Sequence, residues 1–140
     1  MSVPTIDLTD PRVYRHWTTD TVRFSDTDAA GHVNNVAYAA YCETGRLAYA
    51  YSILLPDREP EESFILARIS IDYRRECRWP GAVRIGTAPV KLGSTSITLG
   101  SGVFKDDICV CTAEAVVVFR QAGKPAPIPE RIRARLEADR

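Results

Sequence analysis

One long amphipathic segment followed by segments of alternating polarity constrains the fold of this chain more than any other feature. Between residues 33 and 51 small or apolar side chains recur every three or four positions, and no proline interrupts the span until Pro56. This spacing predicts a helix of about five turns with one buried face. Asn34 or Asn35 can cap its start. The face that we expect to be buried consists of Val33, Val36, Ala37, Ala40, Thr44, Leu47, Ala48 and Tyr51.

After a polar connection at residues 56–62, the spacing of the apolar side chains changes from three or four residues to two, which is typical of strands. Polar turns separate the four strands that we expect next, at residues 69–74, 83–87, 97–103 and 108–120. A short strand at 21–25 precedes the helix, an irregular arm covers 1–18, and a C-terminal helix spans 128–138. A meander of strands beside one long helix predicts an α+β fold, with an antiparallel sheet wrapped around that helix.

The size and charge of the chain suit one ordinary domain, which we place at residues 1–140. The 18 basic and 18 acidic side chains cancel, so no overall field favours nucleic acid or an anionic membrane. No secretory signal and no membrane-spanning stretch is recognisable. Cys109 and Cys111 have neither a zinc-ribbon nor a thioredoxin spacing; in an extended strand they share a face as small buried side chains. We expect a reduced, cytoplasmic protein.

The candidate catalytic side chains are concentrated just after the first predicted strand. Two carboxylates, Asp26 and Asp28, precede a turn containing Gly31 and the Asn-led helix. This order brings Asp28 to the unpaired N–H groups of a helix N-terminus, where a carboxylate can attack a carbonyl or activate water while the helix end stabilises the oxyanion. Asp26, Asp28 and His32 match no zinc or calcium pattern, so we expect no metal. The chain has no Walker or Rossmann glycine pattern, and we expect no cofactor.

The run Asp-Thr-Asp-Ala-Ala-Gly-His-Val-Asn-Asn-Val-Ala-Tyr at residues 26–38, followed by Tyr41, Glu43 and Arg46, resembles the hotdog-fold acyl-CoA thioesterases of the 4-hydroxybenzoyl-CoA thioesterase type. The likeness covers about residues 21–129. It implies a hotdog fold and hydrolysis of an acyl-CoA thioester to a carboxylic acid and free coenzyme A. It also implies a homodimer whose sheets continue across the interface, or a homotetramer of such dimers.

The resemblance implies that Asp28 is the catalytic carboxylate, acting as nucleophile or as general base, and that the backbone N–H of Asn35 is the oxyanion donor. His32 is a candidate acid or water-orienting group, although a turn histidine that bonds its own backbone is an equal alternative. For substrate binding we expect Gly31 and Tyr38; the alternative for Tyr38 is a core side chain or a subunit contact.

Coenzyme A carries phosphates, which arginine and lysine bind well. From the basic side chains on and near the strands we expect Arg74, Lys91 and Arg120 to hold them; a solvated strand face is the alternative. Two other functions stay open at this point: a hotdog hydratase or dehydratase that acts on enoyl or hydroxyacyl thioesters, and a non-catalytic acyl-CoA-binding protein.

Overall fold

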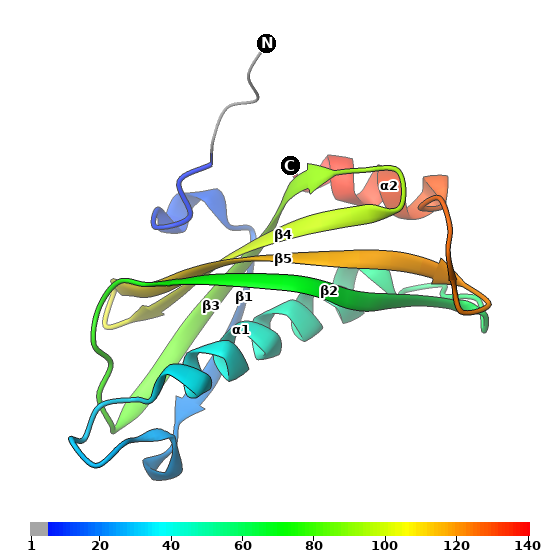
Figure 1. Cartoon of the computed structure of the whole chain (residues 1–140). Coiled ribbons are helices and arrows are strands. Elements are labelled where there is room, and N and C mark those ends of the chain that lie inside the picture. The colour runs from blue at the N-terminus through cyan, green and yellow to red at the C-terminus, as the bar shows by residue number, and fades with distance from the viewer. Residues whose placement is uncertain (1–5) are drawn as a thin grey trace.

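The computed structural model describes residues 6–140. It consists of a curved antiparallel sheet with one long helix lying along its concave side (Figure 1). The strands are β1 (His16–Val22), β2 (Glu62–Tyr73), β3 (Gly81–Leu92), β4 (Ser96–Lys105), β5 (Ile108–Gln121) and the two-residue β6 (Lys124–Pro125). The helices are α1 (Asn35–Tyr49) and α2 (Glu130–Ala138), with short 3-10 turns η1 (Pro11–Val13) and η2 (Phe24–Asp26) and a π-helical end η3 (Ala50–Leu54).

The sheet has the order β1-β3-β4-β5-β2, with β6 paired to β5. This arrangement confirms the predicted hotdog fold. The expected meander is wrong, because β2 pairs with β5 along the length of both strands and β1 pairs with β3. The chain therefore leaves β2 at one edge of the sheet, passes β5 and β4, and enters β3, which lies between β4 and β1. As a consequence β2 is an edge strand and runs above α1 (Figure 1).

Helix α1 is capped as predicted but turns a different face to the sheet. The Asn34 side chain accepts a hydrogen bond from the N–H of Ala37 at 2.9 Å, which marks Asn34 as the N-cap. The expected stripe is wrong at four positions, because the side chains there are exposed: Val36, Ala40, Leu47 and Tyr51. The face that α1 buries consists of Ala37, Tyr38, Tyr41, Cys42, Gly45 and Tyr49.

The N-terminal arm is more regular than expected. Residues 1–5 lie outside the described part, but η1 follows at residues 11–13 and β1 begins at His16, so an irregular arm to residue 18 and a strand at 21–25 are both wrong. The arm packs on the outer face of the sheet over glycines. A Cβ at Gly86 would lie 2.4 Å from Tyr14, and one at Gly100 would lie 2.6 Å from Leu8. The Tyr14 hydroxyl donates to the Leu8 carbonyl at 2.6 Å and so closes the arm on itself.

A β-bulge separates the two close cysteines. Val103 pairs with Cys111 but Phe104 pairs with Cys109, so Val110 is an extra residue in β5. Cys111 consequently faces the helix-side core, whereas Cys109 packs with Phe104 on the outer face. The prediction that both share one face is wrong, since it assumed an unbroken alternation.

Helix α2 begins at Glu130, two residues later than expected, and is tied to the turn before β4 and to the start of β2. Its buried Ile132 and Leu136 face the core, while Arg133 donates to the carbonyl of Gly93 at 2.7 Å. Arg131 forms an ion pair with Glu62, whose exposed fraction is 5%.

Candidate active site

The loop between β1 and α1 is anchored to the helix through Asp26. Its Oδ2 atom accepts from the Tyr41 hydroxyl at 2.7 Å and from the N–H of Arg23 at 2.9 Å. Its carbonyl accepts from the backbone and side-chain nitrogens of Asn34, both at 2.8 Å. Asp26 thus holds the residue that caps α1, which agrees with a structural role.

Asp28 shapes the same loop with one of its two carboxylate oxygens. Oδ1 accepts from the N–H groups of Ala30 at 2.9 Å and of His32 at 3.1 Å. Gly31 follows in the left-handed region at a φ of 82°, where glycine is favoured. Within the described residues Oδ2 has no hydrogen-bond or ion-pair partner, and the side chain is exposed. The loop therefore orients the carboxylate and leaves one oxygen for a ligand.

The first turn of α1 has unused donors beside this carboxylate. The first N–H groups of a helix lack intrahelical partners, and the Asn34 cap accepts only that of Ala37. The N–H groups of Asn35 and Val36 bond to nothing else in the part of the chain that the structure describes. The Tyr73 hydroxyl donates to the Asn35 carbonyl at 3.1 Å and ties the turn to the end of β2.

His32 lies between Asp28 and a second carboxylate. Its backbone N–H bonds to Asp28, and its ring Nε2 lies 3.2 Å from Oε2 of Glu76. That ring atom is buried, and its contact with Glu76 is not aligned as a hydrogen bond. The same Glu76 oxygen lies 3.9 Å from Arg78. The backbone N–H of His32 therefore fixes the position of the residue, and its ring Nε2 is still able to form a hydrogen bond.

These groups line one open cleft of about 330 Å³ between the loop and the end of β2. The predicted residues Asp28, His32, Asn35, Tyr38 and Arg74 all contribute to it, together with Val33, Tyr73, Arg75 and Glu76.

Tyr38 is chiefly a core side chain within this cleft. Its exposed fraction is 4%, and its hydroxyl donates to the Arg75 carbonyl at 2.9 Å. Burial raises the pKa of Tyr38 to about 12. Its hydroxyl thus acts as a neutral donor that fixes the chain after β2.

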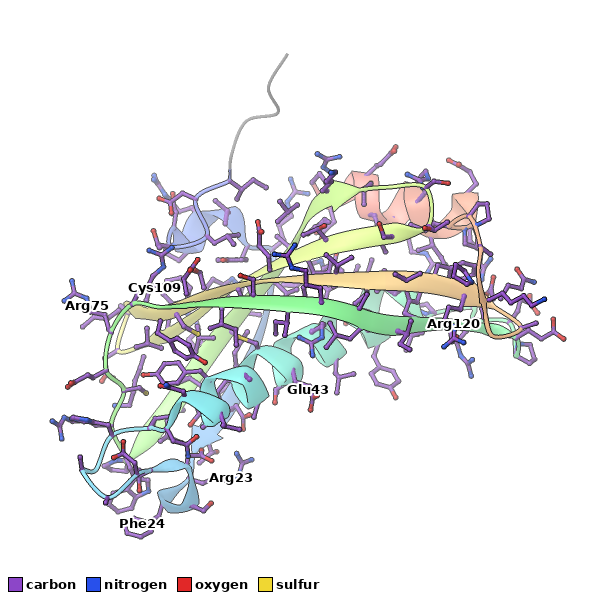
Figure 2. All side chains as sticks on the ribbon, in the orientation of Figure 1. Arg23, Phe24, Glu43, Arg75, Cys109 and Arg120 are labelled. Atoms are coloured by element: carbon purple, nitrogen blue, oxygen red, sulfur yellow. The ribbon has the colours of Figure 1, made fainter. Side chains whose placement is uncertain are left out.

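The cleft also has a basic wall. Arg74 contributes to it while its Nε donates to Thr112 at 3.0 Å, and Arg75 is exposed beside it. Lys91 and Arg120 are not part of the cleft within this chain. Arg120 donates to the Gly123 carbonyl at the far end of β5, and Figure 2 shows it at the opposite end of the molecule from Arg75.

Sequence reasoning missed Tyr73 and Glu76 as cleft residues. Both come from the end of β2 and the segment after it, 45 and 48 residues from Asp28 in the sequence. No motif marks them. The strand alternation places Tyr73 at a strand end, but only the pairing of β2 with β5 brings that end to the start of α1.

The described residues contain no group of three or more His, Cys, Asp or Glu side chains placed to hold a metal ion. Likewise, neither helix of residues 6–140 is long and apolar enough to cross a membrane.

Comparisons with known proteins support the fold. A family model for the thioesterase-like superfamily matches residues 22–136. A thioesterase of Thermus thermophilus, solved in complex with coenzyme A and zinc, is 32% identical; the match covers 89% of this chain and 93% of that one at a TM-score of 0.80. A thioesterase-superfamily protein of Jannaschia sp. CCS1 is 28% identical over 94% of this chain and 87% of its own, at a TM-score of 0.82. YsmA of Bacillus subtilis, an uncharacterised protein, is 30% identical over 74% of this chain and 72% of its own.

Proposed function

This chain belongs to the thioesterase-like superfamily, and on that basis we propose that it hydrolyses acyl-CoA thioesters to a carboxylic acid and free coenzyme A. The observation that carries the proposal is the Asp28 carboxylate, which has one oxygen held by two backbone N–H groups and the other unpaired within residues 6–140. It lines the same cleft as Asn35, whose backbone N–H in the first turn of α1 has no partner within residues 6–140. The coenzyme A bound to the Thermus relative supports the class of substrate.

The chemistry requires a carboxylate and an oxyanion donor on opposite sides of one carbonyl. In one course Asp28 attacks the thioester carbon, the C–S bond breaks to release the coenzyme A thiolate, and water then hydrolyses the mixed anhydride. In the other course Asp28 removes a proton from a water molecule that attacks the carbon, and the tetrahedral intermediate expels the thiolate. In either course the carbonyl oxygen gains negative charge, which the N–H of Asn35 at the helix N-terminus stabilises. Because a thiolate leaves readily, strong acid assistance is less necessary than for an amide. Both courses need Asp28 in the same place.

The basic side chains beside the cleft suit the phosphates of coenzyme A. Arg74 and Arg75 lie next to the cleft at the end of β2, where a guanidinium can bind a phosphate with two parallel hydrogen bonds. Lys91 and Arg120 lie away from this cleft in a single copy of the chain. Their predicted role in binding the same molecule therefore requires a partner subunit.

A homodimer that pairs through β2 is part of the proposal. β2 has one unpaired edge, and four of its apolar side chains have exposed fractions between 36% and 50%: Ile65, Leu66, Ile69 and Tyr73. An exposed apolar edge strand favours pairing with another strand. Since Tyr73 also lines the cleft, a partner on this edge would complete one wall of the site.

Light scattering after gel filtration tests the dimer. We expect wild type to elute as a dimer or tetramer and Leu66→Lys on β2 to shift it toward the monomer. Ile108→Lys is the matched control, because Ile108 is an apolar strand residue with a 54% exposed fraction, outside the stretch of β5 that pairs with β2. A monomeric wild type, or equal effects of both variants, would contradict the β2 interface.

The test of the activity is thiol release from short, long and aromatic acyl-CoAs. Asn at position 28 keeps an oxygen that accepts the two loop N–H bonds but cannot serve as nucleophile or base, so Asp28→Asn should fold normally and lose about 10²–10⁴-fold in kcat/KM. Asp107→Asn, in the exposed turn before β5, is the control and should keep wild-type turnover. An active Asp28→Asn variant would refute the role of Asp28. Hydration of an enoyl-CoA without thiol release would favour the hydratase alternative.

A further inference from the structure

The side of α1 that points away from the sheet carries a row of exposed apolar side chains. The row continues into η3 and consists of Val36, Ala40, Leu47 and Tyr51, with Glu43 at its centre. The exposed fractions of Val36, Leu47 and Tyr51 are 79%, 50% and 71%, and Figure 2 shows Glu43 directed away from the strands. Spacings of three and four residues place all five on one side of a helix. We call these five residues the outer row.

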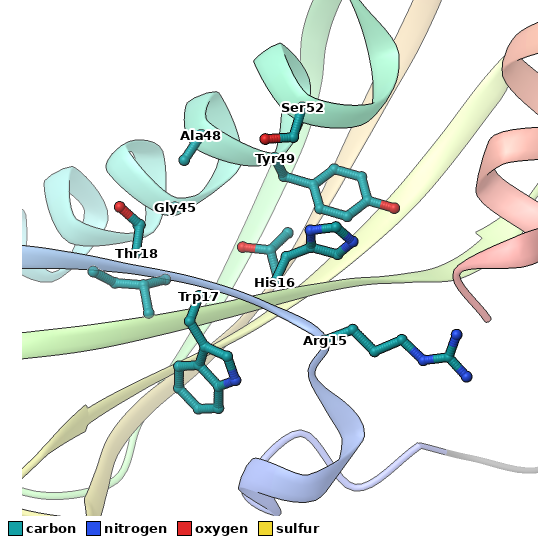
Figure 3. Close-up of a pocket in the computed structure, with 10 residues that line it drawn as sticks. Arg15, His16, Trp17, Thr18, Gly45, Ala48, Tyr49 and Ser52 are labelled. Carbon is teal, nitrogen blue, oxygen red and sulfur yellow. The ribbon is translucent and has the colours of Figure 1, made fainter.

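The other sides of α1 already face the sheet. The buried side lies on the strands. Toward β1, the Thr44 hydroxyl donates to Asp20 at 2.9 Å, and a cavity of about 230 Å³ lies between the helix and the strands further along (Figure 3). Toward β2, the Tyr73 hydroxyl donates to the Asn35 carbonyl. Because the side chains of the outer row stay exposed, no described residue covers them.

The order of side chains in the outer row is complementary to itself. Two copies of α1 can lie antiparallel about a two-fold axis that passes midway between residues 43 and 44. The small Ala40 then faces the larger Leu47 of the opposing copy, and Val36 faces the opposing Tyr51. A two-fold interface requires a match of this kind, because one patch must fit an identical patch.

The charges at the centre of the helix also suit a second copy. Glu43 and Arg46 are three residues apart, yet neither forms an ion pair within residues 6–140. In the antiparallel arrangement Glu43 and the opposing Arg46 are offset by two helix positions, which is about 3 Å along the axis. Each Glu43 can therefore pair with the opposing Arg46, and the arginines neutralise the two glutamates that the same axis brings together.

The area of this face indicates how many copies take part. With 15 residues, α1 is about 22 Å long and about 10 Å wide, so one pair of helices buries roughly a few hundred Å² per chain. A stable interface needs about 800 Å² per partner. The homodimer proposed through β2 carries two copies of α1 on one face of its sheet, because a two-fold axis between paired edge strands is perpendicular to that sheet. Two such dimers contact through two helix pairs, which doubles the area buried per partner.

We propose that the outer row binds the outer row of a second copy in antiparallel orientation and thereby joins two dimers into a tetramer. The proposal rests on the β2 dimer of the proposed function but not on its chemistry. An exposed apolar patch rimmed by polar residues marks such a contact. The opposing Tyr51 lies against Val36, whose N–H is one of the unpaired donors at the start of α1 within residues 6–140. Each dimer therefore shields the outer side of the candidate site in the other.

Light scattering of a Leu47→Lys variant tests the contact. Lysine four residues after Glu43 forms a favourable helical pair, so the change does not weaken the helix itself, but it places a charge against the opposing Ala40. We expect wild type to have the mass of four chains and Leu47→Lys the mass of two. Ile108→Lys, at an exposed apolar position of β5, is the control and should stay tetrameric. A wild type smaller than a tetramer, or a tetrameric Leu47→Lys variant, would overturn the proposal.

Engineered cysteines test the antiparallel register. A chain that carries both Ala40→Cys and Leu47→Cys places each new thiol opposite one of the other copy, so oxidised glutathione should link two chains covalently. Ala40→Cys alone should not link them, because the two copies of residue 40 are seven positions, or about 10 Å, apart along the axis, beyond the reach of a disulfide. Links in the single variant but not in the double variant would indicate parallel helices and overturn the proposal.

These measurements do not depend on turnover. A protein without thiol release whose mass still halves in Leu47→Lys would refute the proposed activity and leave this interface intact. An active protein that is a dimer in wild type and a monomer in Leu66→Lys would refute the interface through α1 and leave the proposed function intact.

Discussion

Two buried tyrosines of α1 make the same kind of hydrogen bond to different aspartates, so they form a matched test of what holds the candidate site. Tyr41 and Tyr49 each have an exposed fraction of 1%, and each donates to an aspartate oxygen at 2.7 Å. Burial, together with the adjacent carboxylate, raises the pKa of both hydroxyls, so they are neutral donors. Only the acceptor of Tyr41, Asp26, also holds the N-cap Asn34.

The expected loss of stability follows from the bond removed. Phenylalanine keeps the ring and creates no large cavity, so the change is one hydrogen bond to a charged group, worth about 1.5–3 kcal/mol. Both acceptors keep a second donor, Arg23 for Asp26 and His16 for Asp139. We therefore expect each variant to lose about 2 kcal/mol, which is roughly a 30-fold change in the unfolding equilibrium and a fall in melting temperature of about 6–10 °C.

The two variants should differ in activity. Tyr41→Phe removes the bond that ties the Asp26 side chain to α1, so the separation of the Asn35 N–H from Asp28 is less well fixed. We therefore expect kcat/KM for thiol release to fall by about tenfold or more. Tyr49→Phe should retain wild-type turnover at about 25 °C. Urea unfolding and steady-state assays on both proteins make the comparison. Equal activity losses, or a Tyr41→Phe variant that is destabilised but fully active, would refute the view that Asp26 positions the site.

Two further predictions concern stability and packing. Glu62→Gln should cost about 2 kcal/mol, because it breaks a buried ion pair whose arginine is partly solvated. Arg131 holds the pKa of Glu62 below its ordinary value of 4.5. Wild type should therefore lose this stabilisation as the pH falls through the lowered pKa, whereas the free energy of unfolding of the variant should depend less on pH in acid. Parallel acid profiles of the two proteins would contradict this. Gly86→Ala should displace the Tyr14 ring and lower the melting temperature, with faster proteolysis of the arm as the measurement; unchanged cleavage would show that the arm is not held there.

The sequence predicted the fold class and the centre of the candidate site because both are encoded locally. Asp28, Gly31, His32 and Asn35 lie within eight consecutive residues, so a strand, a turn and a helix start are enough to bring them together. The helix period and the strand alternation likewise predicted α1 and the four long strands, although the strands extend further than their most regular parts.

The pairing of strands far apart in the sequence, and the face of α1 that is buried, could not be inferred in the same way. Lys91 is ten residues from the start of β3. Because a strand rises about 3.3 Å per residue, Lys91 lies roughly 33 Å from the end of β3 that is nearer to the Asp28 loop. The apolar Val36 and Leu47 predicted the wrong buried face, because period alone does not distinguish a side chain in the core from one that is apolar and exposed. Glu76 reaches the cleft only through the order of the sheet.

The glycines under the N-terminal arm have a consequence for engineering this chain. A furrow runs along the outer sheet where Gly86, Gly100 and Gly102 leave no side chains, and Leu8 and Tyr14 fill it. Deleting residues 6–14 would uncover this furrow and the apolar side chains of Ala88 and Phe104 beside it, whereas a tag added before residue 6 leaves Leu8 and Tyr14 in place. A truncation of the N-terminal arm would therefore expose an apolar surface patch, and we expect such a protein to aggregate before it unfolds.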